Sequence, residues 1–461
     1  MSTGTRTYGG WRERRGFGLA GMSGAQTAGA LGVVVLLLGL SLLNPRVLPI
    51  VGVPLGLALG LWTVRIRGES AVAWLGRHAT WSLARRRRRA SYRASGTYRL
   101  PGVLATFAMV ETSSAGGPVG MTWDQPTNAL TTVLPVEPLG LALVTEEEVS
   151  EWVGAWDDWL AHLGYLPDVK HVVVTVHTGP SPPVPPTSRH PSVPSTMAAE
   201  VLSELTEPHV SGDADHQALT LVSVTVGVQR NDLEASGQRL LELVSTLSTT
   251  LSRCGVRVLE PMSPADLVHW VRSAFDPTQP PTVGATWSDG RPTSTEEFWD
   301  HYRHDASVSA AYVWDEAPGA RFTPAVLTRL FGPSGYHKRV SLVYEPVAAH
   351  DAVREVDRQA EAAAFRAQYR RRLGRDELAR DRADLEKARE TAADQVRGAG
   401  LVDVGLYAVV SASDLTELAR CTVDFENRAG ESRVRLRRNY GSQAPAFACT
   451  LGVGYVPPRG L

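Results

Sequence analysis

The sequence predicts an α+β protein in which an N-terminal two-helix transmembrane hairpin precedes cytoplasmic ferredoxin-like (split βαβ) modules and a long charged helical arm. Three observations lead to this fold class. Two uncharged apolar stretches, 28–43 and 47–64, are separated by only a short polar turn. Strand-like and helix-like periodicities then alternate along the chain. Finally, acids and bases alternate over 348–397, which is typical of solvated helices.

The two apolar stretches have the composition of membrane-spanning helices. No charged residue occurs from Gly16 to Pro45 or from Val47 to Val64, and about 17–25 apolar residues cross a bilayer core. Arginines precede the first stretch and follow the second, so we expect both ends of the hairpin on the cytoplasmic side. The expected location is the inner cell membrane, multi-pass, with the bulk of the chain cytoplasmic. Small residues at every fourth position of the second stretch predict close helix packing: Gly52, Gly56 and Gly60.

The segment after the hairpin predicts a basic interfacial helix. An apolar stripe with Trp74 and Trp81 beside it runs into an arginine cluster, formed by Arg85, Arg86, Arg87, Arg88 and Arg89. Such a cluster predicts contact with anionic lipid. A plain topology signal and a nucleic-acid contact are the alternatives. The net charge of −1 argues neither for nor against nucleic acid, which is not an expected partner.

The pattern divides the chain into a hairpin, a basic helix, and three α+β modules. A proline-rich linker separates the first two modules, and the charged arm lies in the third. The expected boundaries are 1–68 (hairpin), 69–100 (basic juxtamembrane helix), 101–178 (first module), 179–195 (linker), 196–335 (second module) and 336–461 (third module, with the arm over 348–397).

Individual helices and strands follow from capping signals and periodicity. Thr145 and Glu148 form a capping box, and Ser263 followed by Pro264 marks another helix start. A further helix is expected to begin at Ser413. Expected strands are 117–123 and 129–135, joined as a hairpin, and 171–178, 218–229, 256–259, 339–345, 402–411 and 432–436.

The common enzyme motifs are absent from the sequence. It contains no phosphate-binding P-loop, no zinc-protease motif, no nucleophile elbow and no dinucleotide fingerprint. One weak metal candidate remains: on a helix capped by Thr295, the side chains of Glu297, His301 and His304 would share one face. A solvated helix face is the alternative. No catalytic residue and no cofactor are predicted, and the chain is expected not to be an enzyme.

Short motifs along nearly the whole chain resemble an actinobacterial integral-membrane protein family associated with conjugation and type IV secretion-like systems. They include TYGGWRERRGFGLAG (7–21), FDP (275–277), WDHYR (299–303), YEPV (344–347) and the terminal RVRLRRNYGSQAPAF (433–447). The hairpin is similar to PrgI-type subunits, and the C-terminal part looks like the N-terminal domain of conjugation-type secretion ATPases. The chain carries no motor-domain motif, so the resemblance implies a separate ATPase as partner.

These observations lead us to expect a non-enzymatic inner-membrane scaffold that docks a cytoplasmic ATPase, contacts lipid and forms homo-oligomers. A type VII secretion membrane component with two spans and a cytosolic domain is a close alternative. A membrane-bound enzyme acting on lipid or cell-wall precursors is a second alternative, which would use His301 and His304. A tethered DNA-binding factor using the arginine cluster is the third.

Overall fold

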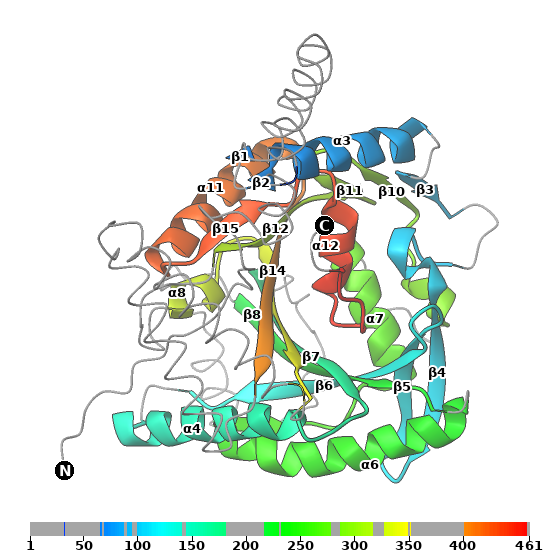
Figure 1. Ribbon diagram of the computed structural model, residues 1–461, viewed down its shortest axis with the longest axis vertical. Coiled ribbons are helices and arrows are strands. Elements are labelled where there is room, and N and C mark those ends of the chain that lie inside the picture. The colour runs from blue at the N-terminus through cyan, green and yellow to red at the C-terminus, as the bar shows by residue number, and fades with distance from the viewer. Residues whose placement is uncertain are drawn as a thin grey trace, which may run out of the picture.

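A computed structural model of the chain describes residues 65–66, 69–86, 90–94, 99–140, 144–180, 216–229, 232–277, 286–316, 327–348 and 401–458, together with Gly32 and Asp351. Within this part of the chain, a 13-stranded sheet dominates the fold, and each pair of neighbouring strands in it is antiparallel. Figure 1 shows the helices arranged around this sheet. A separate two-stranded sheet joins β1 (Arg65–Ile66) to β2 (Glu69–Ser70).

The order of strands is read from one edge of the large sheet to the other. It runs β3 (Ser91–Arg93), β10 (Ser294–Glu297), β11 (Tyr302–His304), β12 (Ser307–Glu316), β14 (Val402–Ala412), β13 (His337–Pro346), β7 (Val169–Pro180), β8 (His216–Gly227), β6 (Ala129–Pro138), β5 (Gly117–Asp124) and β4 (Phe107–Ser114). Two short strands pair with residues near strand ends: β9 (Val256–Val258) with β6, and β15 (Arg435–Arg438) with β12.

The sheet consists of two halves with the same topology. In the first half the order is β4-β5-β6-β8-β7, with β9 on β6; in the second it is β10-β11-β12-β14-β13, with β15 on β12. A short 3-10 helix precedes each half, η1 (Gly102–Thr106) and η3 (Trp287–Gly290). The halves meet where β7 pairs with β13. The element order of one half is therefore related to that of the other by a two-fold axis at this junction.

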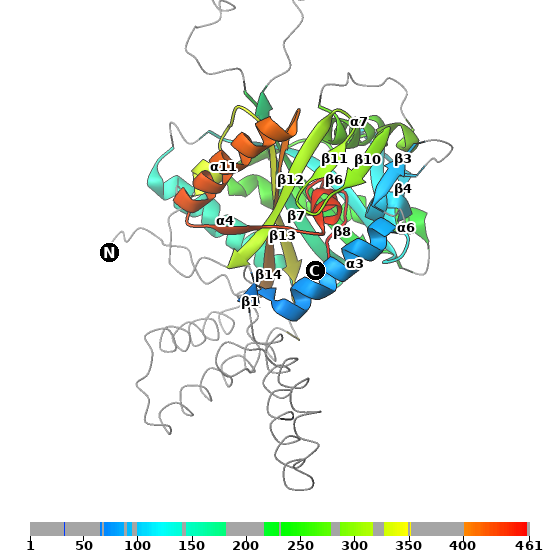
Figure 2. The same cartoon turned by 90° about the horizontal axis from the view of Figure 1, so that it is seen from above.

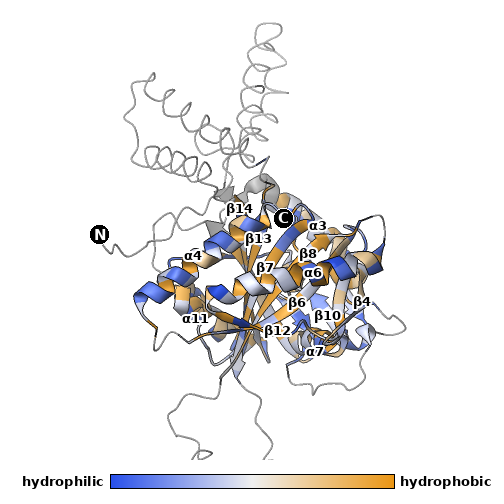
Figure 3. Cartoon of the chain, turned by 90° about the horizontal axis from the view of Figure 1, so that it is seen from below, coloured by the Kyte–Doolittle hydropathy of each residue, from blue (hydrophilic) through white to orange (hydrophobic). Residues whose placement is uncertain are grey.

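Among the described residues, four helices cover the outer face of the sheet, and the pattern of buried residues explains why. They are α4 (Glu146–Leu163) and α6 (Leu233–Leu251) over the first half, and α8 (Thr328–Phe331) and α11 (Leu415–Glu431) over the second. Alternate residues of the strands point to these helices and form two apolar cores, one in each half. Figure 3 shows hydrophobic strands beneath the hydrophilic outward turns of α4.

Two further helices of the described part of the chain lie on the inner face, and each one connects the halves. Helix α7 (Pro264–Phe275) follows β9, and helix α12 (Gln443–Cys449) follows β15. Helix α7 begins over β5 and packs against η3 of the second half, whereas α12 packs against η1 of the first half. Phe275 and Phe447 meet at a ring-centroid distance of 5.1 Å. Figure 2 shows the sheet curving around these two helices.

After α12 the chain crosses the inner face of the first half in close contact with hydroxyl side chains. Thr122 Oγ1 donates to Val453 O at 2.6 Å, and Trp270 Nε1 donates to Leu451 O at 2.8 Å. Gly452 and Gly454 have φ values of +66° and +96°, and a Cβ at Gly454 would overlap Thr131 Oγ1. Only glycine adopts this backbone geometry at so close an approach without strain.

Local sequence signals located most of these elements correctly. The capping boxes at Thr145 and Ser263 are present, and the expected hairpin is formed by β5 and β6. The start of α11 lies slightly later than expected: Asp414, not Ser413, accepts the N-terminal amide bonds, while Ser413 donates to Glu417. The predicted helix beginning at Thr295 is wrong, because this segment forms β10 and β11.

The predicted fold class requires correction. A continuous antiparallel sheet runs through all three expected modules, in place of separate ferredoxin-like units behind a transmembrane hairpin. None of the helices in the described part of the chain is long and apolar enough to cross a membrane. The structure therefore does not support the membrane and transmembrane assignments or the multi-pass location. Apart from Gly32, the two predicted spans, including Gly52, Gly56 and Gly60, lie outside the described residues, as does most of the charged arm.

Candidate functional site

The three residues of the weak metal candidate lie on a β-hairpin and not on a helix face. Glu297 ends β10, His301 lies in the turn and His304 ends β11. The ring of His301 stacks on Phe298 at 4.4 Å, and its Nδ1 lies 2.8 Å from Asp300 Oδ1. Within the described residues, the structure brings no three potential metal ligands together. Each of the three side chains has its own separate set of partners.

His304 is sealed inside the protein. Its Nδ1 donates to Phe275 O, which leaves Nε2 to accept from Ser309 Oγ at 2.6 Å. Ser309 Oγ lies in turn 2.7 Å from Ser411 Oγ. A histidine that activates a serine hydroxyl is the arrangement of nucleophilic enzymes. Here, however, His304 is fully buried and Ser309 is 1% exposed, so a substrate has no access to this pair. Burial also lowers the pKa of His304 to about 3, and the ring is neutral.

Glu297 anchors the start of α12. Its Oε1 accepts a hydrogen bond from the backbone N–H of Ala444 at 3.0 Å. Burial raises the pKa of Glu297 to about 7, against the opposing effect of the amides of Ala444 and Gln443. A raised carboxyl pKa is common at catalytic sites but is also produced by structural burial. The contact with α12 gives Glu297 a structural role.

A group of basic side chains lies on the inner face at the junction of the halves. Arg339 is 3% exposed; it donates through Nε to Thr450 Oγ1 and through Nη1 to Ala274 O, and its guanidinium lies over the ring of Phe447. His177 Nε2 lies 3.4 Å from His337 Nδ1. Burial lowers the pKa of His177 to about 3 and, with Arg339 nearby, also lowers that of His337. These contacts join α7 and α12 to the sheet.

The arginine cluster is described only at Arg85 and Arg86, which end helix α3 (Ala71–Arg86); Arg87, Arg88 and Arg89 lie outside the described residues. The guanidinium of Arg85 lies over the rings of Trp81 and Phe298, at 5.4 and 5.8 Å. Trp74 and Trp81, which we expected beside a lipid surface, instead contact Trp299 of the turn between β10 and β11, at ring-centroid distances of 6.2 and 5.4 Å.

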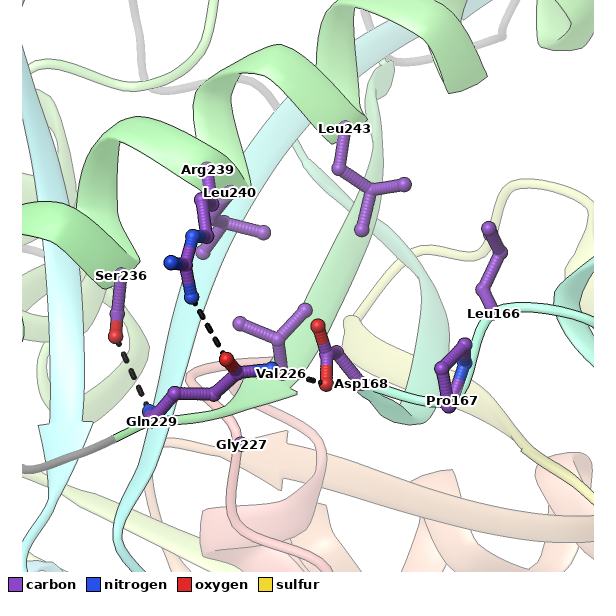
Figure 4. A pocket seen from close by; sticks show the side chains of 10 residues that line it. All are labelled: Leu166, Pro167, Asp168, Val226, Gly227, Gln229, Ser236, Arg239, Leu240 and Leu243. Carbon is purple, nitrogen blue, oxygen red and sulfur yellow. Dashed lines mark hydrogen bonds between the residues drawn. The ribbon is translucent and has the colours of Figure 1, made fainter.

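A pocket opens where α6 passes over the start of β7 and the end of β8 (Figure 4). Its volume is about 130 Å³, and an apolar floor is combined with a polar rim. The floor is lined by Leu166, Pro167, Val226, Leu240 and Leu243. Engineered apolar cavities of similar size, about 150 Å³, bind benzene. The pocket thus fits one aromatic or aliphatic side chain.

Gln229 holds the rim of this pocket in place. Its Nε2 donates to Asp168 Oδ1 at 2.7 Å, and its Oε1 accepts from Arg239 Nη1 at 2.7 Å. The backbone N–H of Gln229 donates to Ser236 Oγ at 3.2 Å. The amide therefore lies between an acid and a base and bonds to both. The result is a preformed apolar pocket with a rim able to hydrogen-bond an incoming chain.

Sequence reasoning did not find this pocket. Asp168 follows a helix, Gln229 follows a strand, and Arg239 lies on a helix, so nothing in the local pattern connects them. The pairing of β7 with β8 brings them together, with Val169 opposite Val226. The available signal was the concentration of polar residues at the ends of these two strands.

Comparison with known proteins gives no assignment for this site. No protein-family model matches the chain, and no curated protein sequence matches it.

Proposed function

We propose that the chain is a non-enzymatic scaffold of a conjugation or type IV secretion-like apparatus that docks a separate ATPase. The motif resemblance of the C-terminal part to the N-terminal domain of conjugation-type ATPases supports this proposal. The observation that carries it is the preformed pocket at Leu166, Leu240 and Leu243, whose rim is held by Gln229. Anchor side chains in well-packed pockets contribute most of the affinity of protein interfaces.

The geometry of the pocket suits a protein partner better than a substrate. In the rim, Asp168 and Arg239 are each bonded to the neutral amide of Gln229, and the floor between them is apolar. Leu243 is half-buried and faces the pocket (Figure 4). An apolar residue of the ATPase, inserted among these leucines, would exclude water while its backbone bonds the rim.

The test is quantitative binding of the full-length chain to the ATPase of the same apparatus, first identified by cross-linking and mass spectrometry. Leu243→Arg places a charge in the pocket, and we expect it to weaken binding at least about 30-fold, since a hot spot contributes about 2 kcal/mol or more. Leu415→Arg is the matched control, because Leu415 is 47% exposed on α11. Equal affinity of both variants, or cross-linking to no ATPase, would contradict the proposal.

A further inference from the structure

The pocket beneath α6 has a counterpart in the second half of the sheet, beneath α11. Each of these helices begins at an aspartate N-cap, Asp232 for α6 and Asp414 for α11. Counted from the cap, residues four, seven, eight and eleven of α6 line the pocket: Ser236, Arg239, Leu240 and Leu243. The residues at the same four positions of α11 are buried: Leu418, Cys421, Thr422 and Phe425. The same helix face is therefore next to a pocket in one half and covered in the other.

In the second half a tyrosine covers this face. Tyr336 directly precedes β13, is 9% exposed, and belongs to the apolar core that includes Leu418 and Phe425 of α11. Its hydroxyl donates to Asp424 Oδ2 of the same helix at 2.8 Å. The ring thus packs beneath α11, and its polar end reaches a carboxylate on the helix.

The entry to β7 carries smaller side chains than the entry to β13. Asp168 directly precedes β7, and Val169 is its first residue. Asp168 Oδ1 accepts from Gln229 Nε2, and Val169 packs in the core of the first half. A volume of about 130 Å³ is left beneath α6. A phenol ring is only slightly larger than benzene, which a cavity of about 150 Å³ holds.

We infer that the pocket receives a tyrosine side chain of a partner chain, in the place that Tyr336 takes in the second half. The inference rests on the proposed function, since it names the residue by which the ATPase is anchored. The ring lies against Leu166, Leu240 and Leu243, which face the pocket in Figure 4. An aromatic side chain with a polar end suits such a site, because its ring is buried while its hydroxyl reaches the rim.

The acceptor for the tyrosine hydroxyl is Glu242. It lies ten residues after Asp232, as Asp424 lies ten residues after Asp414. It also lies three residues after Arg239, which lines the pocket, and residues three apart are neighbours on a helix surface. Hydrogen bonds to a carboxylate are among the stronger ones. This acid therefore favours tyrosine over phenylalanine.

The first test uses the full chain and N-acetyl-L-tyrosine amide as the probe, so it requires no ATPase. Methyl NMR of Leu240 and Leu243 measures binding. We expect the probe to bind about 10-fold more tightly than N-acetyl-L-phenylalanine amide, which lacks the hydrogen bond to the carboxylate. Glu242→Ala should abolish this preference, whereas Glu234→Ala, in the first turn of the same helix, should retain it. Equal affinity of the wild-type chain for the two amides would overturn the inference.

A second test fills the pocket from within the chain. Asp168→Tyr places a ring at the entry to β7, and we expect it to weaken binding of the tyrosine amide at least about 10-fold. Asp168→Asn is the matched control, because it retains an oxygen that can accept from Gln229 and leaves the pocket open. Cooperative urea unfolding of both variants verifies that they fold. If Asp168→Tyr bound the probe as tightly as Asp168→Asn, the inference would be wrong.

These measurements separate the tyrosine site from the scaffold role. A chain that selects the tyrosine amide but cross-links to no ATPase would support the tyrosine site and contradict the scaffold role. A chain that docks the ATPase through Leu243 but binds both amides equally would contradict the tyrosine site alone.

Discussion

Thr175 Oγ1 and Ser341 Oγ lie 2.7 Å apart at the junction of the two halves of the sheet. Thr175 is opposite Ser341 in the middle of the β7–β13 ladder, which runs from Thr178 opposite Lys338 to Val172 opposite Tyr344. Both side chains are fully buried. The hydroxyl pair thus lies where the two-fold relation between the halves places its axis.

Removal of both hydroxyls should destabilise this junction by less than the sum of the two single removals. Thr175→Val leaves the buried Ser341 hydroxyl without this partner, which costs about 1–3 kcal/mol. In the double variant Thr175→Val/Ser341→Ala neither polar group remains, and we expect a loss smaller than the sum of the single losses. Urea unfolding of the four proteins gives the coupling free energy. A coupling of zero would show that the two hydroxyls act independently.

Substitution of Gly454 by alanine should destabilise the fold, whereas the same substitution at Gly430 should not. Its φ of +96° and its closeness to Thr131 exclude a side chain, so we expect Gly454→Ala to lower the free energy of unfolding by about 1–3 kcal/mol or more. A Cβ added at Gly430 in α11 would meet no atom within 4 Å. There, Gly430→Ala should stabilise by up to about 1 kcal/mol. Thermal denaturation compares the two, and similar effects would contradict this account of the inner face.

Trp299 should determine whether α3 stays on the body. In Trp299→Ala the aromatic contacts with Trp74, His78 and Trp81 are lost, and we expect faster tryptic cleavage within α3, after Arg77 or Arg85. Trp314→Ala is the control, because Trp314 is a partly buried tryptophan that packs against the apolar core of the second half. Mass spectrometry of the first fragments locates the cut. Unchanged cleavage in α3 would mean that other contacts hold the helix.

Local signals in the sequence were sufficient for most single elements. Capping boxes at Thr145 and Ser263 fix two helix starts through hydrogen bonds made within four residues. The prediction of a helix after Thr295 was wrong, because a short run of residues can fit both the helical and the strand periodicity. The i, i+4 spacing of Glu297 and His301 suits a helix, while Tyr302, Arg303 and His304 alternate buried, exposed and buried as in a strand.

Long-range pairing could not be predicted from local patterns. The ladder between β7 and β13 joins residues such as Val173 and Val343, which are remote in the sequence. A periodic pattern indicates that a strand exists but does not identify its neighbours. This is why separate modules were expected where the structure has a continuous sheet. The pocket was missed for the same reason, since Asp168 and Gln229 meet only through the β7–β8 pairing.

Glu297 should make stability depend on pH in a way that one substitution removes. Its pKa is raised to about 7 in the folded protein from 4.5 when unfolded, because burial disfavours the charge. Between these values the folded state binds more protons than the unfolded state, so this group makes the free energy of unfolding fall as pH rises from about 4.5 to 7. The buried His304, whose pKa is lowered to about 3, has the opposite effect between pH 3 and 6.5.

Glu297→Gln retains an oxygen that can accept from Ala444 N–H and removes the titration, while the histidine contribution cancels in the comparison with wild type. We therefore expect the variant to gain stability relative to wild type between pH 5 and pH 8, measured as the difference in urea midpoint. If that difference were the same at both pH values, the pKa of Glu297 would not be raised by folding.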